Sequence, residues 1–250
     1  MQNKHYFFLL IVLLFAACAP RLSYRLDNHD MITVETSAGM DSSINNIIQP
    51  YRDSIQGVMG EVIGYSPQSL IGKKPESGLS NFVADLVWEA GKKFLRSQNI
   101  EGESFCIINI RGLRSTMPRG DVTTRDIFEI MPFENSMVAV EMDAQNLKLL
   151  FDHIAYSNGD GLAGASFTLK GNIAENIRVN NQPIQPDKKY WVITSDYLAD
   201  GGDGYAVFKN SERHLVSYEK VRELIIEHIQ HLTRQGLSIE PDLSTRITIE

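Results

Sequence analysis

The chain has 250 residues, a formal net charge of −7 and 43% hydrophobic residues. This length suffices for one large domain or two small ones, and the apolar content is ample for a core. An acidic chain with no basic run longer than Lys73-Lys74 or Lys188-Lys189 is a poor candidate for nucleic-acid binding. We therefore expect no nucleic-acid partner, and any bound phosphate has to be held by a few placed cations.

The N-terminus has the layout of an export signal. The cation Lys4 precedes an apolar run over residues 6–17, which is shorter than the roughly 20 residues of a membrane-spanning helix. Phe15-Ala16-Ala17-Cys18 resembles the lipobox of bacterial lipoproteins, in which the cysteine is acylated; an ordinary signal peptide is the alternative. We predict a signal peptide over 1–17, a tether over 18–30, and lipidation of Cys18, which would anchor the protein outside the cytoplasm on a bacterial membrane, in the periplasm or at the cell surface.

The second cysteine, Cys106, lies in the apolar run 105–110. We predict that it is a buried small hydrophobe. Because Cys18 would be acylated, no intramolecular disulfide is expected, and stability has to come from the core.

Hydrophobic periodicity and turn residues predict the remaining elements. In chain order these are a strand at 31–36, a helix at 42–56, a strand at 58–66, a helix that starts near 77–80 with a serine as its N-cap and runs to 96, a strand at 104–110, a short helix or turn at 126–130, a strand at 136–142, a helix at 144–156, strands at 166–169, 173–179 and 190–195, a helix at 218–234, and a strand at 245–249. The mixture lacks strict β-α-β alternation, which is typical of an α+β fold. No proline-rich or glycine-rich linker interrupts residues 31–250, so we expect one domain with mixed sheets flanked by helices.

Four segments place polar and aromatic residues in loops at strand ends, where functional sites are common. They are residues 76–85, 109–123, 130–135 and 194–205. The arginines of the second segment suit a phosphate or carboxylate, and Phe133 and Tyr197 could face each other as a clamp for a flat base. Asp203, between glycines, could accept hydrogen bonds from sugar hydroxyls. Singly, each has a commoner explanation in a solvated arginine, core packing or a turn; together they describe a nucleotide site.

In this order the segments resemble the C-terminal domain of the 5′-nucleotidase family, the secreted nucleotide and UDP-sugar hydrolases. The motifs E-x-x-x-G-N-L-x-x-D, N-G-G-G-I-R, G-D-I-T, L-P-F-x-N, V-N-G-x-P-L-x-P-x-x-x-Y and N-D-Y-L-A-x-G-G-D-G-Y correspond to residues 76–85, 109–114, 120–123, 131–135, 179–190 and 195–205. The resemblance covers about residues 58–249. It implies the α+β fold of that domain, which recognises the substrate while a separate N-terminal metallophosphoesterase domain performs the chemistry.

The resemblance also implies roles for individual residues. Phe133 and Tyr197 would stack on the base, and Asp203 would hold the ribose hydroxyls. The ribose and phosphate side would further involve Asn109, Arg114, Arg111 and Asn135.

The sequence departs from the family pattern on the phosphate side. Ile110 and Arg111 stand where N-G-G-G-I-R has its first two glycines, and Pro75 replaces an arginine before Glu76. Lys73, Lys74 and Arg111 are the candidates to compensate. Base and ribose recognition are therefore better matched than phosphate recognition.

The family's phosphoesterase domain needs a two-metal site rich in histidine, because two metals activate water and stabilise the leaving oxygen. This chain has six histidines: His5, His29, His153, His214, His228 and His231. His228 and His231 could share a helix face, but no third ligand accompanies them by spacing. We therefore predict no catalytic residue, metal or cofactor here, and divalent metals in a separately encoded phosphoesterase partner. The alternatives are a binding lipoprotein that captures nucleosides or nucleotides, and a scaffold.

Overall fold

The computed structural model describes residues 41–211 and 213–250. The predicted signal peptide, Cys18, the tether and the predicted strand at 31–36 lie outside the described residues. The chain divides into two units, residues 1–48 and 49–250. Within the described residues, no helix is both long enough and apolar enough to cross a membrane.

The first described element is the helix α2 (Ser42–Met59), which confirms the helix predicted at 42–56 and continues it by three residues. Its N-terminus is capped by Asp41, whose carboxylate accepts from the backbone N–H of Ser43 at 2.9 Å. None of its residues is buried, and Pro50 lies within it.

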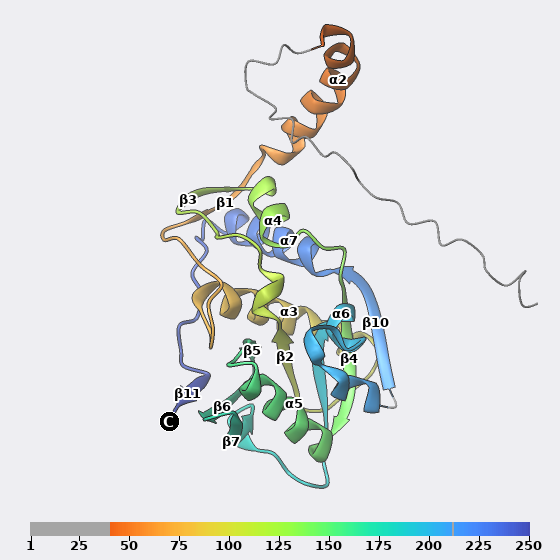
Figure 1. The fold of residues 1–250 in the computed structure, drawn as a ribbon, viewed down its shortest axis with the longest axis vertical. Helices are drawn as coiled ribbons and strands as arrows, with labels where there is room; N and C mark the ends of the chain where they lie inside the picture. The colour runs from red at the N-terminus through yellow and green to blue at the C-terminus, as the bar shows by residue number, and fades with distance from the viewer. Residues whose placement is uncertain (1–40, 212) are drawn as a thin grey trace, which may run out of the picture. The chain divides into compact units, whose positions relative to one another are not determined.

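A five-stranded mixed sheet forms the centre of the unit formed by residues 49–250 (Figure 1). Its strand order is β10 (Arg213–Lys220), β4 (Ser136–Asp143), β9 (Lys189–Ser195), β2 (Ser104–Ile108) and β5 (Gly161–Ala163). The neighbours β2 and β9 are parallel, and the other pairs are antiparallel. Together with the flanking helices, this mixed sheet confirms the predicted α+β fold.

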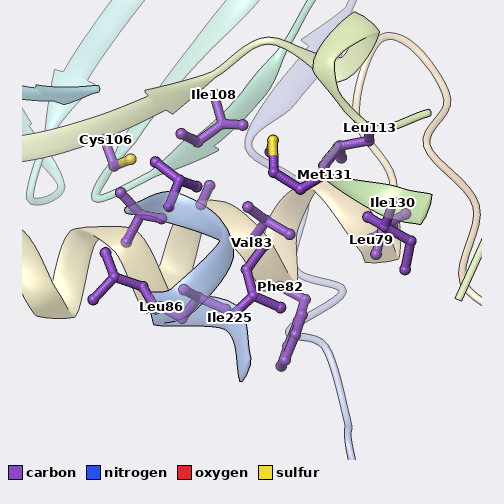
Figure 2. Close-up of a cluster of buried hydrophobic side chains, with 14 of the residues drawn as sticks. Leu79, Phe82, Val83, Leu86, Cys106, Ile108, Leu113, Ile130, Met131 and Ile225 are labelled. Atoms are coloured by element: carbon purple, nitrogen blue, oxygen red, sulfur yellow. The ribbon is translucent and has the colours of Figure 1, made fainter. Parts of the chain in front are cut away.

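Both faces of the central sheet are buried, so alternate residues of β2 enter two different cores. Cys106 and Ile108 face the core beneath α3 (Gly78–Ser97) and α7 (Val221–Arg234), part of which is drawn in Figure 2. Phe105 and Ile107 face the other core, beneath α5 (Ala144–Tyr156). Cys106 is fully buried, as predicted, and its burial raises the pKa of the thiol.

Two smaller sheets complete the fold. The four-stranded sheet has the order β11 (Ile247–Ile249), β6 (Ala165–Lys170), β7 (Ile173–Val179) and β8 (Gln182–Pro183), with β11 parallel to β6. The two-stranded sheet joins β1 (Val62–Ser66) to β3 (Gly120–Thr123), and α4 (Thr124–Ile130) follows β3 directly. Ser77 caps α3 as predicted, because its hydroxyl accepts from the backbone N–H of Ser80.

Several predicted boundaries are wrong. The helix predicted from Tyr218 begins at Val221, because residues 213–220 form the unpredicted edge strand β10. No residue of β10 is fully buried, so its sequence lacks the alternation that signals a strand. The strand predicted from Val58 begins at Val62, and the strand predicted to reach Ile110 ends at Ile108, where a short 3-10 turn follows.

Candidate functional site

Three loops meet at one edge of the central sheet because of the strand directions. β2 and β9 are parallel, so their carboxyl ends lie at the same edge. β4 is antiparallel to β9, with Met137 opposite Ser195, so β4 begins at that edge. The loops after β2, before β4 and after β9 therefore converge, although they are far apart in sequence.

The converging loops enclose a pocket of about 580 Å³. Its lining comprises Asn109, Arg111, Gly112, Leu113, Arg114, Phe133, Asn135, Tyr197 and Asp203. Every residue that the sequence analysis placed at the base, the ribose or the phosphate lies in this lining. Their individual roles remain predictions.

The loop before β4 is held by backbone and side-chain contacts on both sides. The carbonyl of Phe133 accepts from Arg222 Nη1 at 3.3 Å, and Glu134 forms an ion pair with the same guanidinium. The carbonyl of Asn135 accepts from the N–H of Val221 at 2.9 Å. These contacts fix the half-buried Phe133 ring, and the guanidinium carbon of Arg114 lies 5.2 Å from its centroid.

Tyr197 lies on α6 (Asp196–Ala199), which follows β9 directly and is capped by the Ser195 hydroxyl. Its ring packs over Gly202, where a Cβ would come within 2.5 Å of Cζ, so only glycine allows this approach. The side chain is 43% exposed. Among the described residues, no ring contact joins Phe133 to Tyr197, and both side chains line the pocket.

Asp203 is bonded to two other predicted site residues. Its Oδ1 accepts from the Tyr197 hydroxyl at 2.9 Å, and its Oδ2 accepts from the Asn109 amide at 2.8 Å. Its φ of 49° lies in the left-handed region, which aspartate tolerates better than most residues. The hydrogen bond to Asp203 raises the pKa of Tyr197, so the hydroxyl keeps its proton. The Asn109–Asp203 contact places the Asn109 amide beside the carboxylate that is predicted to hold the ribose hydroxyls.

Asp160, which was not singled out from the sequence, holds the backbone between two lining residues, Asn109 and Arg111. Its side chain accepts from the N–H of Ile110 at 2.9 Å and from the Tyr205 hydroxyl at 2.6 Å. It is 3% exposed, and burial raises its pKa although Lys74 Nζ lies 3.6 Å away. The only sequence signal is its position between Gly159 and Gly161, which matches the glycine-flanked setting of Asp203.

A second hollow of about 440 Å³ adjoins the pocket and shares Arg111 and Asp203 with it. Lys74 lines this second hollow, where its ammonium donates to the Ser157 carbonyl at 2.6 Å. Of the three cations proposed to compensate for Pro75, only Arg111 therefore lines the pocket itself. Arg111 and Arg114 are exposed, and neither side chain forms an ion pair within the described part of the chain.

The two C-terminal histidines lie elsewhere. His228 and His231 line a hollow of about 500 Å³ between α3 and α7, and burial lowers the pKa of His228, whose ring contacts Phe82. In residues 41–211 and 213–250, no group of three or more histidine, cysteine or acidic side chains is placed to hold a metal ion.

The fold and the pocket define an α+β domain with a candidate binding site built from loops at one edge of its central sheet. The chain belongs to the family of 5′-nucleotidase C-terminal domains: it matches "5'-nucleotidase, C-terminal domain" over residues 59–210.

Known relatives agree with this assignment. The chain is 24% identical over 227 residues to the trifunctional nucleotide phosphoesterase protein YfkN of Bacillus subtilis, a match that covers 80% of this chain and 14% of that protein. It is 23% identical to a 5′-nucleotidase of Vibrio parahaemolyticus, covering 70% of this chain and 31% of that protein. The 5′-nucleotidase precursor from Thermus thermophilus shares the fold, with a TM-score of 0.69 and 19% identity over 82% of this chain and 42% of that structure. The chain thus spans less than half the length of each.

Proposed function

We propose that the chain binds a nucleoside or nucleotide in the pocket at the sheet edge. The observation that carries the proposal is the lining itself, because one cavity of about 580 Å³ gathers two aromatic rings, a carboxylate and two guanidinium groups. Phe133 and Tyr197 hold the base between their rings. Asp203 accepts hydrogen bonds from the ribose hydroxyls.

The phosphate end of the ligand lies toward Arg111 and Arg114. Both guanidinium groups are exposed and without an ion pair among the described residues, so they are available to bind anionic oxygens. Asn109 and Asn135 contribute amide groups to the pocket lining.

We further propose that the chain supplies recognition to a separately encoded metallophosphoesterase, which carries the divalent metals. In these relatives the matching domain is part of a longer chain, because this chain corresponds to 14% of a protein named a nucleotide phosphoesterase and to 31% of one named a 5′-nucleotidase. The two chains together would hydrolyse nucleotides outside the cytoplasm. Lipidation of Cys18 would hold this chain on the bacterial membrane and raise its effective concentration toward a partner on the same surface.

Calorimetric titration with adenosine, AMP and UDP-glucose tests the binding step. The expected result is binding of adenosine, with Phe133→Ala weakening it by about 1–3 kcal/mol through the lost stacking. Phe94→Ala is the matched control, since Phe94 is also half-buried but lies on α3 outside the pocket. If none of the three ligands binds, or if both variants behave alike, the proposed site is wrong.

The partner is tested separately, with the purified chain and an exported metallophosphoesterase encoded near it. Addition of this chain is expected to lower the KM for AMP. An unchanged KM together with no association would contradict the proposal that this chain supplies recognition to a separate metallophosphoesterase.

Capture of nucleosides without hydrolysis is the second candidate function. It is favoured by Pro75 in place of the family's arginine, and by Lys74, whose ammonium is already bonded to Ser157 and lies near Asp160. Adenosine affinity that does not change when a phosphate is added would support this function over hydrolysis.

A further inference from the structure

The Arg114 guanidinium lies over the ring of Phe133, with its carbon 5.2 Å from the ring centroid. We infer that Arg114 competes with the base for this ring, and that an anionic group on the ligand relieves the competition by binding the guanidinium. The site then selects nucleotides over nucleosides through linkage between base and anion. The inference rests on the proposed function and adds a sign to it: removal of Arg114 tightens the binding of a nucleoside.

The face of Phe133 that Arg114 covers is the face toward the pocket. The Phe133 ring packs against the core beneath α3 and α7 and is half-buried, so only part of its surface is open. Arg114 lines the same pocket as Phe133, and its guanidinium therefore approaches the ring from the pocket side. One face of an aromatic ring takes one planar group at stacking distance. A base that stacks on Phe133 from the pocket therefore has to displace the guanidinium.

The guanidinium is also near the second ring, that of Tyr197. The hydrogen bond to Asp203 raises the pKa of Tyr197, and the positive charge of Arg114 acts on the same hydroxyl in the opposite direction. Arg114 and the two aromatic side chains belong to one pocket lining. A single cation thus lies close to both rings that hold the base, so its position affects the whole base-binding region.

The side chain of Arg114 can leave Phe133 without disturbing the loop that carries it. Its backbone is fixed, because its N–H donates to the Ile130 carbonyl at 2.8 Å. Within residues 41–211 and 213–250, no ion pair holds the exposed guanidinium. A cation–π contact at an exposed site changes an equilibrium by only about two- to fivefold, whereas a guanidinium binds phosphate oxygens through two parallel hydrogen bonds. A phosphate group therefore binds the guanidinium in preference to the ring.

These contacts couple the two ends of a ligand. When a nucleoside binds, the cation–π contact is lost and nothing replaces it, so the affinity is lower by about two- to fivefold. A nucleotide supplies a phosphate to the displaced guanidinium, which removes this penalty. Because linkage is reciprocal, an anion bound at Arg114 raises the affinity for the base by the same factor as the base raises the affinity for the anion.

The first test is calorimetric titration of adenosine and AMP into the native chain, Arg114→Ala and Arg119→Ala. Arg119 is the matched control, because it is an exposed arginine of the same segment that lies outside the pocket lining, and its variant is expected to keep both native affinities. Arg114→Ala is expected to bind adenosine about two- to fivefold more tightly than the native chain does, and AMP more weakly. A residue that only contacts the phosphate would leave the adenosine affinity unchanged, and a folding defect would weaken both ligands.

The second test uses the native chain and does not depend on the folding of any variant. Adenosine is titrated at increasing concentrations of inorganic phosphate, with chloride replaced so that pH and ionic strength stay the same. Phosphate is expected to tighten adenosine binding in the native chain and in Arg119→Ala, and to have no such effect in Arg114→Ala. If phosphate leaves the native affinity for adenosine unchanged, or if folded Arg114→Ala binds adenosine no more tightly than the native chain, the inference is wrong while the proposed function stands. If the native chain binds neither adenosine nor AMP, both are wrong.

Discussion

Replacement of Asp160 by alanine is expected to destabilise the protein more than any surface change, because Asp160 accepts hydrogen bonds from two buried groups. The N–H of Ile110 and the hydroxyl of Tyr205 both lose their acceptor, and the Tyr205 side chain is 1% exposed. Each stranded donor costs about 1–3 kcal/mol. Removal of a buried carboxylate, whose raised pKa shows that burial disfavours its charge, offsets part of this cost.

The net loss in the free energy of unfolding is therefore expected to be about 2–4 kcal/mol. For a domain of this size, that corresponds to a fall in Tm of about 5–15 °C. Urea unfolding followed by circular dichroism gives the free energy directly.

Two further variants separate this mechanism from a general effect. Tyr205→Phe removes one donor and is expected to cost about 1–2 kcal/mol, and the double variant is expected to cost less than the sum, because the stranded hydroxyl is then absent. Asp187→Ala, at an exposed position, is expected to change stability by less than about 0.5 kcal/mol. If the free energy of unfolding of Asp160→Ala lies within about 0.5 kcal/mol of that of the native protein, the supporting role assigned to Asp160 is refuted.

Three other changes have defined outcomes. Since burial raises the pKa of Asp160, this carboxyl keeps its proton to higher pH in the folded state than in the unfolded state, and the stability that the proton contributes is lost as pH rises through that raised pKa. Asp160→Asn is expected to remove this decline from urea midpoints measured between about pH 4 and 7. If the native protein and the variant show the same pH dependence, the expectation is contradicted. Gly202→Ala places a Cβ within 2.5 Å of the Tyr197 ring. Because the exposed ring can swing outward, this variant is expected to weaken adenosine binding in calorimetry and to change Tm little. Gly57→Ala is the control, since a Cβ at position 57 has no atom within 4 Å. Gly91→Ala places a Cβ within 2.5 Å of the buried Ile193 side chain and is expected to cost about 1–3 kcal/mol in urea unfolding through overpacking; an unchanged midpoint would show that this contact relaxes.

Elements with one buried stripe could be predicted from the sequence. The helix α5 has the predicted bounds, and the serine cap of α3 was found because a hydroxyl before an apolar stripe is a local signal. β10 was missed because an edge strand with exposed side chains has no such signal. Its place is instead fixed by non-local contacts, such as Lys220 Nζ donating to the Glu134 carbonyl at 2.8 Å.

The residues that line the pocket could be predicted for a similar reason, but the hydrogen bonds that join them could not. Phe133, Tyr197 and Asp203 each stand in a short motif that can be read locally. The bond between Asn109 and Asp203 joins residues 94 positions apart and depends on the parallel pairing of β2 with β9. Asp160 was missed because the residues beside a buried aspartate can be the same as those beside an exposed aspartate in a turn.

The match to the family ends at residue 210, but the folded domain continues beyond it. Glu76, just before α3, accepts from the N–H groups of Arg246 and Ile247 at 2.9 and 3.0 Å, and the Arg246 guanidinium donates to Asp85 at 2.7 Å. A recombinant fragment cut at residue 210 would lose the edge strand β10, the helix α7 over one core, and this link between distant parts of the chain. Residues 246 and 247 are also synthesised after every residue of the pocket. The bonds from residues 246 and 247 to Glu76 can therefore form only after every residue of the pocket has been synthesised.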